Sequence, residues 1–199
     1  MSDVEEIVRA RNNLEEVHQG QGGIWNSFKG DVCARCVAHY IQTHLSSKLK
    51  VVGPNVYLDG FPTEFDLLIV SEGATARQFT AAYPPTLAVA GIEVKASGVM
   101  GGRKGLQLQK TLGRIKNNFD AIRARFPHVA FAYITIREVS QPRREGSINY
   151  LEETKRVLAP YQVFCLQDVR TKEIFEEQWD QFMHFLKEAA TTSEKRFSE

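Results

Sequence analysis

Apolar residues recur at helical spacing in several stretches of the chain. In residues 26–45, Val32, Val37 and Ile41 fall on one side of a helix. Residues 171–190 carry a longer stripe that includes Trp179 and Phe182, which favours packing against a core over a groove for a partner. The pattern predicts helices over residues 3–19, 26–45, 104–126, 149–158 and 171–190.

Short apolar runs rich in β-branched and aromatic residues alternate with these helices and predict strands. The first run is interrupted by Gly53-Pro54. We expect strands over residues 50–58, 64–70, 87–97, 129–136 and 161–167. The long polar insertion at 71–86 could recognise DNA, form an interface or act as a mobile cover.

The order of the elements predicts the fold class. Three successive strands indicate a meander, and a helical connection into each later strand indicates parallel neighbours. We therefore expect one α/β domain over residues 1–199, with a mixed β-sheet core flanked by α-helices on both faces. The core spans about 26–168, and the first and last helices pack on it.

Composition narrows the class of protein without deciding its function. The 199 residues carry 25% charged side chains and a formal net charge of +1, typical of a globular domain. No apolar run reaches the roughly 18–20 residues of a membrane helix, and residues 1–13 carry no apolar segment typical of a secretory signal. We expect a cytoplasmic protein that does not bind membranes. Cys33 and Cys36 have CxxC spacing without a second pair, which favours packing over zinc binding.

Three charged residues interrupt apolar strands. Asp66 precedes the apolar end of its run, and Glu93 and Lys95 stand two apart in the next run. Residues two apart share one face of a strand, so Glu93 and Lys95 project together, and Asp66 joins them if the two strands are neighbours. Two carboxylates and the carbonyl of Val94 would suit Mg²⁺, for which we expect Mn²⁺ to substitute. On spacing alone, a surface ion pair remains the alternative.

The segments EFDLLIV and GIEVKASG resemble the two halves of the PD-(D/E)xK signature of restriction endonuclease-like nucleases. The resemblance covers roughly residues 28–135, including the helix that begins with FKGD. It implies a restriction endonuclease-like fold and metal-dependent hydrolysis of DNA phosphodiesters. A restriction system or a phage-defence system could be the setting of such a nuclease. The resemblance also implies that Asp66, Glu93 and Lys95 are catalytic, and that a dimer or a partner subunit could complete the enzyme.

Two features depart from the family pattern. The family's proline is not adjacent to Asp66, since Phe61-Pro62 lies upstream. Many members also carry a glutamate on the first helix, where this chain has Ala34. Asp31, one turn earlier, could replace it as a metal ligand, and Glu64 could assist Asp66. If Asp31 cannot reach the site, binding of a second metal is in doubt, and the chain could be a catalytically inactive module that binds DNA or protein.

The helix after the E-x-K segment is basic. Lys104, Lys110, Arg114 and Lys116 would meet DNA phosphates near the site that the resemblance implies. Gln107 and Gln109 of the same stretch could support that site. A solvated helix face is the alternative for each of these residues.

Overall fold

The computed structural model describes residues 1–17, 23–97, 106–138 and 149–197. Its helices are α1 (Asp3–Val17), α2 (Gly23–His44), α3 (Leu106–Arg125), α4 (Tyr150–Leu158) and α5 (Glu176–Phe197). Its strands are β1 (Leu49–Val52), β2 (Val56–Leu58), β3 (Glu64–Phe65), β4 (Leu67–Ser71), β5 (Ala82–Tyr83), β6 (Ala88–Lys95), β7 (Ala130–Thr135) and β8 (Gln162–Cys165). A short 3₁₀ helix, η1 (Pro85–Leu87), precedes β6.

Five strands form the central sheet in the order β1-β4-β6-β7-β8. β4 runs antiparallel to both of its neighbours, β1 and β6, which is the expected meander. β6, β7 and β8 run parallel, with α3 and α4 as the connections between them. Leu67 pairs with Ile92, so the start of β4 lies beside the second half of β6. The expected mixed sheet is confirmed.

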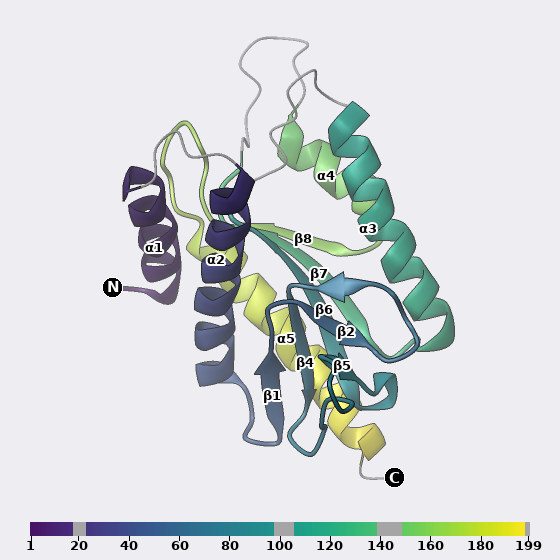
Figure 1. Ribbon diagram of the computed structural model, residues 1–199. Helices are drawn as coiled ribbons and strands as arrows, with labels where there is room; N and C mark the ends of the chain where they lie inside the picture. Colours follow the sequence, from purple (N-terminus) through teal and green to yellow (C-terminus); the bar gives the residue numbers. More distant parts are fainter. Residues whose placement is uncertain (18–22, 98–105, 139–148, 198–199) are drawn as a thin grey trace.

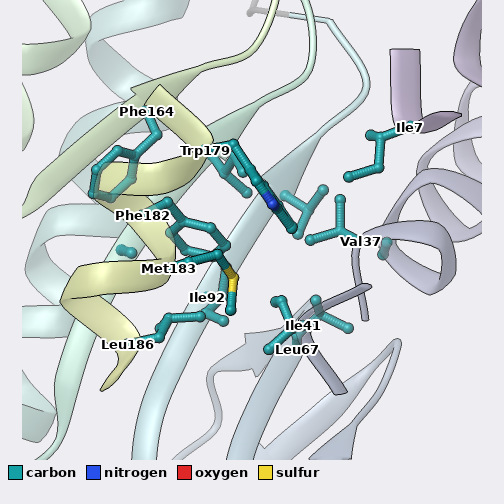
Figure 2. Packing of buried hydrophobic residues seen from close by; sticks show 14 of the residues in the cluster. Ile7, Val37, Ile41, Leu67, Ile92, Phe164, Trp179, Phe182, Met183 and Leu186 are labelled. Carbon is teal, nitrogen blue, oxygen red and sulfur yellow. The ribbon is translucent and has the colours of Figure 1, made fainter. Parts of the chain in front are cut away.

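Helices cover both faces of this sheet, as expected (Figure 1). On one face, α1, α2 and α5 pack together over alternate residues of the strands, such as Leu67 of β4 and Ile92 of β6. Figure 2 shows side chains of this cluster, among them Trp179 and Phe182 of α5 and Val37 of α2. On the other face, α3 and α4 pack over the intervening strand residues. Successive side chains of the strands therefore point to opposite faces of the sheet and contribute to two separate cores.

A second, three-stranded sheet with the order β3-β2-β5 lies on the α3 face. The single strand predicted over 50–58 was wrong, because the chain turns at Gly53 and its two halves join different sheets. The insertion at 71–86 carries β5 and most of η1, so it is not simply a polar loop. Phe65 of β3 stacks on Phe119 of α3 and Phe131 of β7, which fixes the small sheet on the large one.

The last helix is displaced from its predicted range. Residues 171–175 do not start a helix, because Ile174 forms a bridge with Gln167 and the N–H of Phe175 donates to the carbonyl of Leu166. α5 begins at Glu176 and continues to Phe197, beyond the predicted end at residue 190, and Ser193 is buried. For α1, the described helix ends at Val17, and residues 18–22 lie outside the described part.

Gly91 of β6 makes room for the aromatic stack. A Cβ atom at this position would lie 2.7 Å from Phe65 and 3.0 Å from Phe131. We expect Gly91→Ala to lower the free energy of unfolding by about 1–3 kcal/mol, since overpacking forces these rings from their places. Thermal unfolding checks this, and an unchanged melting temperature would show that the stack yields without cost.

Candidate active site

Asp66 lies at the point where the chain passes from the small sheet into the large one. It stands between the end of β3 and the start of β4. Its Oδ2 accepts a hydrogen bond of 2.7 Å from the backbone N–H of Val94 in β6. The pairing of β4 with β6 stops at Leu67, so the Asp66 carboxylate occupies the next position along the β6 edge. The carboxylate is thus held by the strand that carries the E-x-K segment.

Glu93 and Lys95 project from the same face of β6, as the two-residue period of a strand requires. Their neighbours Ile92 and Val94 point to the opposite face, into the cluster of α1, α2 and α5. Lys95 Nζ lies 2.6 Å from Glu93 Oε1 and 3.1 Å from Asp66 Oδ2. One ammonium therefore bridges the carboxylate of Glu93 in β6 and that of Asp66, which precedes β4. The side chains of Asp66, Glu93 and Lys95 are 24%, 16% and 28% exposed, so substrate can reach a partly desolvated group.

The backbone of Val94 adds a third oxygen to this corner. In a strand, the N–H and C=O of one residue point toward the same neighbouring strand. Because the N–H of Val94 points to Asp66, its carbonyl faces the same edge of β6. The expected grouping of Asp66, Glu93 and the Val94 carbonyl is therefore compatible with the backbone geometry.

Burial and the neighbouring opposite charge shift the pKa of Glu93, and also that of Lys95, in opposite directions. Burial raises the pKa of Glu93 above its ordinary value, against the opposing effect of Lys95, and the charge of Asp66 raises it further. Burial alone would lower the pKa of Lys95, but Glu93 and Asp66 together raise it. The two carboxylates therefore favour the protonated form of Lys95, in which it is a hydrogen-bond donor.

The donor set fits a hard divalent cation. Two carboxylates converge on one position that a cationic ammonium reaches, and carboxylate and carbonyl oxygens are the ligands that Mg²⁺ prefers. Within the described residues, no group of three His, Cys, Asp or Glu side chains gathers at one point. Asp31 of α2 and Glu64 of β3 therefore do not form a three-acid group with Asp66 and Glu93.

The structure gives other surroundings to the residues considered as auxiliary acids. Glu64 is exposed at the edge of the small sheet, and its Oε2 accepts a hydrogen bond of 2.7 Å from the Tyr57 hydroxyl. Asp31 is half-buried on α2. Ala34, where the family pattern has a glutamate, is 1% exposed in the core between α2 and α1. Cys33 beside it is a buried free thiol, and burial raises its pKa to about 12, as suits a packing residue.

Some polar residues of the basic helix α3 are exposed, and others pair with neighbouring side chains. Lys110 and Arg114 are exposed and one turn apart, and the charge of Arg114 acts on Glu93. Lys116 instead pairs with Asp120 at 3.0 Å. Gln109 donates to Glu153 and so ties α3 to α4. Lys104 lies outside the described residues, as does the side chain of Gln107.

A buried arginine of α1 was missed by the sequence reasoning. Arg11 is 2% exposed and donates from Nε to the Ala96 carbonyl at 3.0 Å and from Nη2 to Ser97 Oγ at 2.7 Å. It also pairs with Glu15, which accepts a second bond of 2.8 Å from Arg137 beyond β7. α1 thus holds the chain immediately after the E-x-K segment.

A signal for this contact was present in the sequence. Val4, Ile7, Val8 and Arg11 form one helical stripe, and all four are buried. An arginine that continues an apolar stripe indicates a buried partner for its charge. Burial alone would raise the pKa of Glu15, but Arg11 and Arg137 hold that pKa below its ordinary value. The ion pairs therefore favour the charged form of Glu15.

Solved structures resemble this architecture at low sequence identity. NucC of P. aeruginosa ATCC27853, in a cAAA-bound form, shares 9% identity and a TM-score of 0.56, covering 100% of this chain and 99% of that one. NucC of E. coli MS115-1, also in a cAAA-bound form, shares 12% identity and a TM-score of 0.50, covering 68% and 60%. The Bse634I restriction endonuclease shares 10% identity and a TM-score of 0.43, covering 92% and 84%.

The chain has a restriction endonuclease-like fold. The resemblance of EFDLLIV and GIEVKASG to the two halves of the nuclease signature agrees with this fold, and Asp66 contacts both Val94 and Lys95 of the E-x-K segment. No family model and no curated protein sequence matches the chain. At these sequence identities a shared fold does not establish a shared reaction. The chemistry of the site depends on its own residues. Among its described helices, none is long and apolar enough to cross a membrane.

Proposed function

We propose that this chain is a metal-dependent endonuclease that hydrolyses DNA phosphodiester bonds, in a restriction or phage-defence setting. One observation carries the proposal: Lys95 Nζ lies within 3.1 Å of both Asp66 Oδ2 and Glu93 Oε1, in a partly buried corner of a restriction endonuclease-like fold. Without a function for the charges, burying two carboxylates and an ammonium at this corner costs more than an apolar corner would.

Asp66, Glu93 and the Val94 carbonyl would hold Mg²⁺, or Mn²⁺ in its place. When bound, such an ion polarises a phosphoryl oxygen and lowers the pKa of a water. The protein's own contribution comes from Lys95, whose ammonium form the neighbouring carboxylates favour. That ammonium donates to the negative charge that develops on the phosphate during attack. The hydrogen bond from Val94 N–H keeps Asp66 aimed at the same position.

DNA would approach along the face that α3 borders. Lys110 and Arg114 are exposed there, and their charges suit phosphates on either side of the scissile bond. Contacts of this kind make affinity fall with rising salt concentration. Lys116 would contribute less, because Asp120 already neutralises it.

The second candidate is a module of the same fold that binds DNA or protein without cutting. Ala34 favours it, because a methyl group is buried where the family pattern has an acid. On this alternative, Asp66 and Glu93 would serve only to pair with Lys95. Cleavage distinguishes the two candidates.

The test is cleavage of a panel of supercoiled, linear duplex, single-stranded and branched DNA in Mg²⁺ or Mn²⁺. We expect metal-dependent cutting by the wild type and a loss of about a hundredfold in Lys95→Ala, the usual effect of removing one donor to a developing charge. Lys187→Ala, an exposed lysine on α5, is the matched control and should cut as the wild type does. No cutting of any substrate would favour the binding module, and equal cutting by Lys95→Ala would point to a contaminant.

The raised pKa of Glu93 predicts how metal affinity depends on pH. A cation competes with the proton on Glu93, and burial favours the protonated form. Mg²⁺ affinity should therefore fall as the pH is lowered, beginning at a higher pH than an ordinary glutamate would give. Isothermal titration calorimetry in two buffers of different ionisation enthalpy measures both the affinity and the protons released. Affinity that stays constant until ordinary carboxylates protonate would contradict the assignment of Glu93.

A further inference from the structure

The insertion between β4 and β6 presents one aromatic ring to solvent. Phe79 is 97% exposed, more than any other large hydrophobic residue in the part of the chain that the structure describes. Its backbone has a φ of 61°, a left-handed conformation that bulky residues rarely adopt. A ring kept out of the core by an unfavourable backbone conformation indicates a task at the surface.

The turn that carries this ring is well fixed. The N–H of Arg77 donates to the Ala82 carbonyl at 2.8 Å, and the N–H of Thr80 donates to the Arg77 carbonyl at 3.0 Å. The Thr80 hydroxyl donates to the same carbonyl at 3.0 Å. The Arg77 guanidinium also donates to Asp59 at 3.2 Å. Phe79 therefore stands on a short closed turn that is tied to the small sheet on both sides.

The register of the small sheet places this turn toward the candidate active site. Val56 of β2 pairs with Phe65 of β3. On the other side of β2, the N–H of Tyr57 donates to the carbonyl of Ala81. Two inter-strand spacings, roughly 10 Å, thus separate the backbones of Phe65 and Ala81. Asp66 follows Phe65 at the same end of the sheet from which the chain of the turn enters β5.

The area of the ring and the residues around it favour one class of binding partner over another. A stable protein interface covers about 800 Å² on each partner, whereas one phenylalanine buries about 150–250 Å². The neighbouring residues of the turn are exposed and supply no further large apolar side chain; they are Thr75, Ala76, Arg77, Gln78, Thr80 and Ala81. A single apolar side chain on a rigid support is the form taken by wedges that enter between base steps of DNA.

We propose that Phe79 is a wedge that contacts and partly unstacks a base step of duplex DNA lying across the candidate site. This inference rests on the proposed function. The ring would enter a base step to one side of the scissile phosphate, and Asp66 and its partners would act on the phosphate itself. Unstacking would bend the duplex, and pyrimidine–purine steps, which unstack with least cost, would be preferred.

The test uses the full chain with Lys95→Ala, which should bind DNA without cutting it, and duplexes that carry 2-aminopurine. Fluorescence of 2-aminopurine rises when its stacking is lost. We expect a rise on binding, its loss in Phe79→Ala together with a drop of roughly tenfold in affinity, and partial retention in Phe79→Leu. Gln78→Ala, the adjacent exposed residue, is the control and should behave as the parent protein does.

Two outcomes would overturn the wedge. One is Phe79→Ala binding and unstacking the duplex as well as its parent. The other is a change in sedimentation on Phe79→Ala with no effect on the DNA, which would place the ring in an interface between copies of the chain. Cleavage by otherwise wild-type protein separates this inference from the proposed function. If the wild type cuts DNA and Phe79→Ala has no effect, only the wedge is contradicted. If the protein unstacks DNA but does not cut it, only the proposed nuclease function is contradicted.

Discussion

Asp66→Asn should reduce cleavage by about a thousandfold while leaving the protein folded. Asp66 has two tasks that need its charge, since Oδ2 accepts from Val94 N–H and also from Lys95. An asparagine can keep one hydrogen bond to the backbone, but it removes a metal ligand and one of the two anions that hold Lys95 protonated. The loss should therefore appear both in metal affinity and in the rate at saturating metal.

The rate of plasmid nicking and the affinity for Mn²⁺ measure the two effects of Asp66→Asn. Asp180→Asn, an exposed aspartate on α5, is the matched control and should change neither. Circular dichroism shows whether the fold is kept. If Asp66→Asn cuts at more than about a tenth of the wild-type rate, the carboxylate has no part in the chemistry and the site is elsewhere.

Gly53→Ala should be the most damaging change outside the charged residues. Gly53 has a φ of 145°, and a Cβ there would meet the carbonyl oxygen of Asp66 at 2.3 Å and a methyl group of Leu67 at 2.9 Å. The backbone oxygen cannot swing aside as a side chain can. We expect a loss of about 3 kcal/mol in the free energy of unfolding, from the clash and the strained φ together. Activity should fall further than stability, because the residue that is pushed away is Asp66.

Thermal unfolding and cleavage at a temperature well below the transition separate the two effects of Gly53→Ala. The expected decrease in melting temperature is roughly 6–12 °C for a chain of this size. Gly73→Ala is the matched control, since a Cβ at Gly73 would meet no atom within 4 Å. A Gly53→Ala protein with normal activity would show that the position of Asp66 tolerates a shift of its backbone.

The sequence was sufficient for the parts of the fold that depend on local pattern. The period of two in IEVKAS put Glu93 and Lys95 on one face, and the two side chains form an ion pair there. The apolar runs gave β4, β6, β7 and β8, because buried central strands are nearly continuous in apolar residues. The meander and the two crossovers followed from the order of the elements.

Long-range contacts account for what the sequence did not predict. The halves of 50–58 look alike in composition, and only the turn at Gly53 sends them to different sheets. Gln109 resembled a residue near the site, but its partner is Glu153 on α4. Arg11 reaches residues that follow the E-x-K segment far along the chain. Periodicity describes a face of one element, and it does not identify the element that meets that face.

The most direct test of the central claim is a titration of Mg²⁺ into metal-free protein and supercoiled plasmid. The measurement compares the wild type with the double variant Asp66→Asn/Glu93→Gln. We predict no cutting without metal, a rate that rises to saturation with Mg²⁺ for the wild type, and no rise for the double variant. Cutting in the presence of a chelator, or the same rise in both proteins, would contradict a metal-dependent nuclease built on Asp66, Glu93 and Lys95.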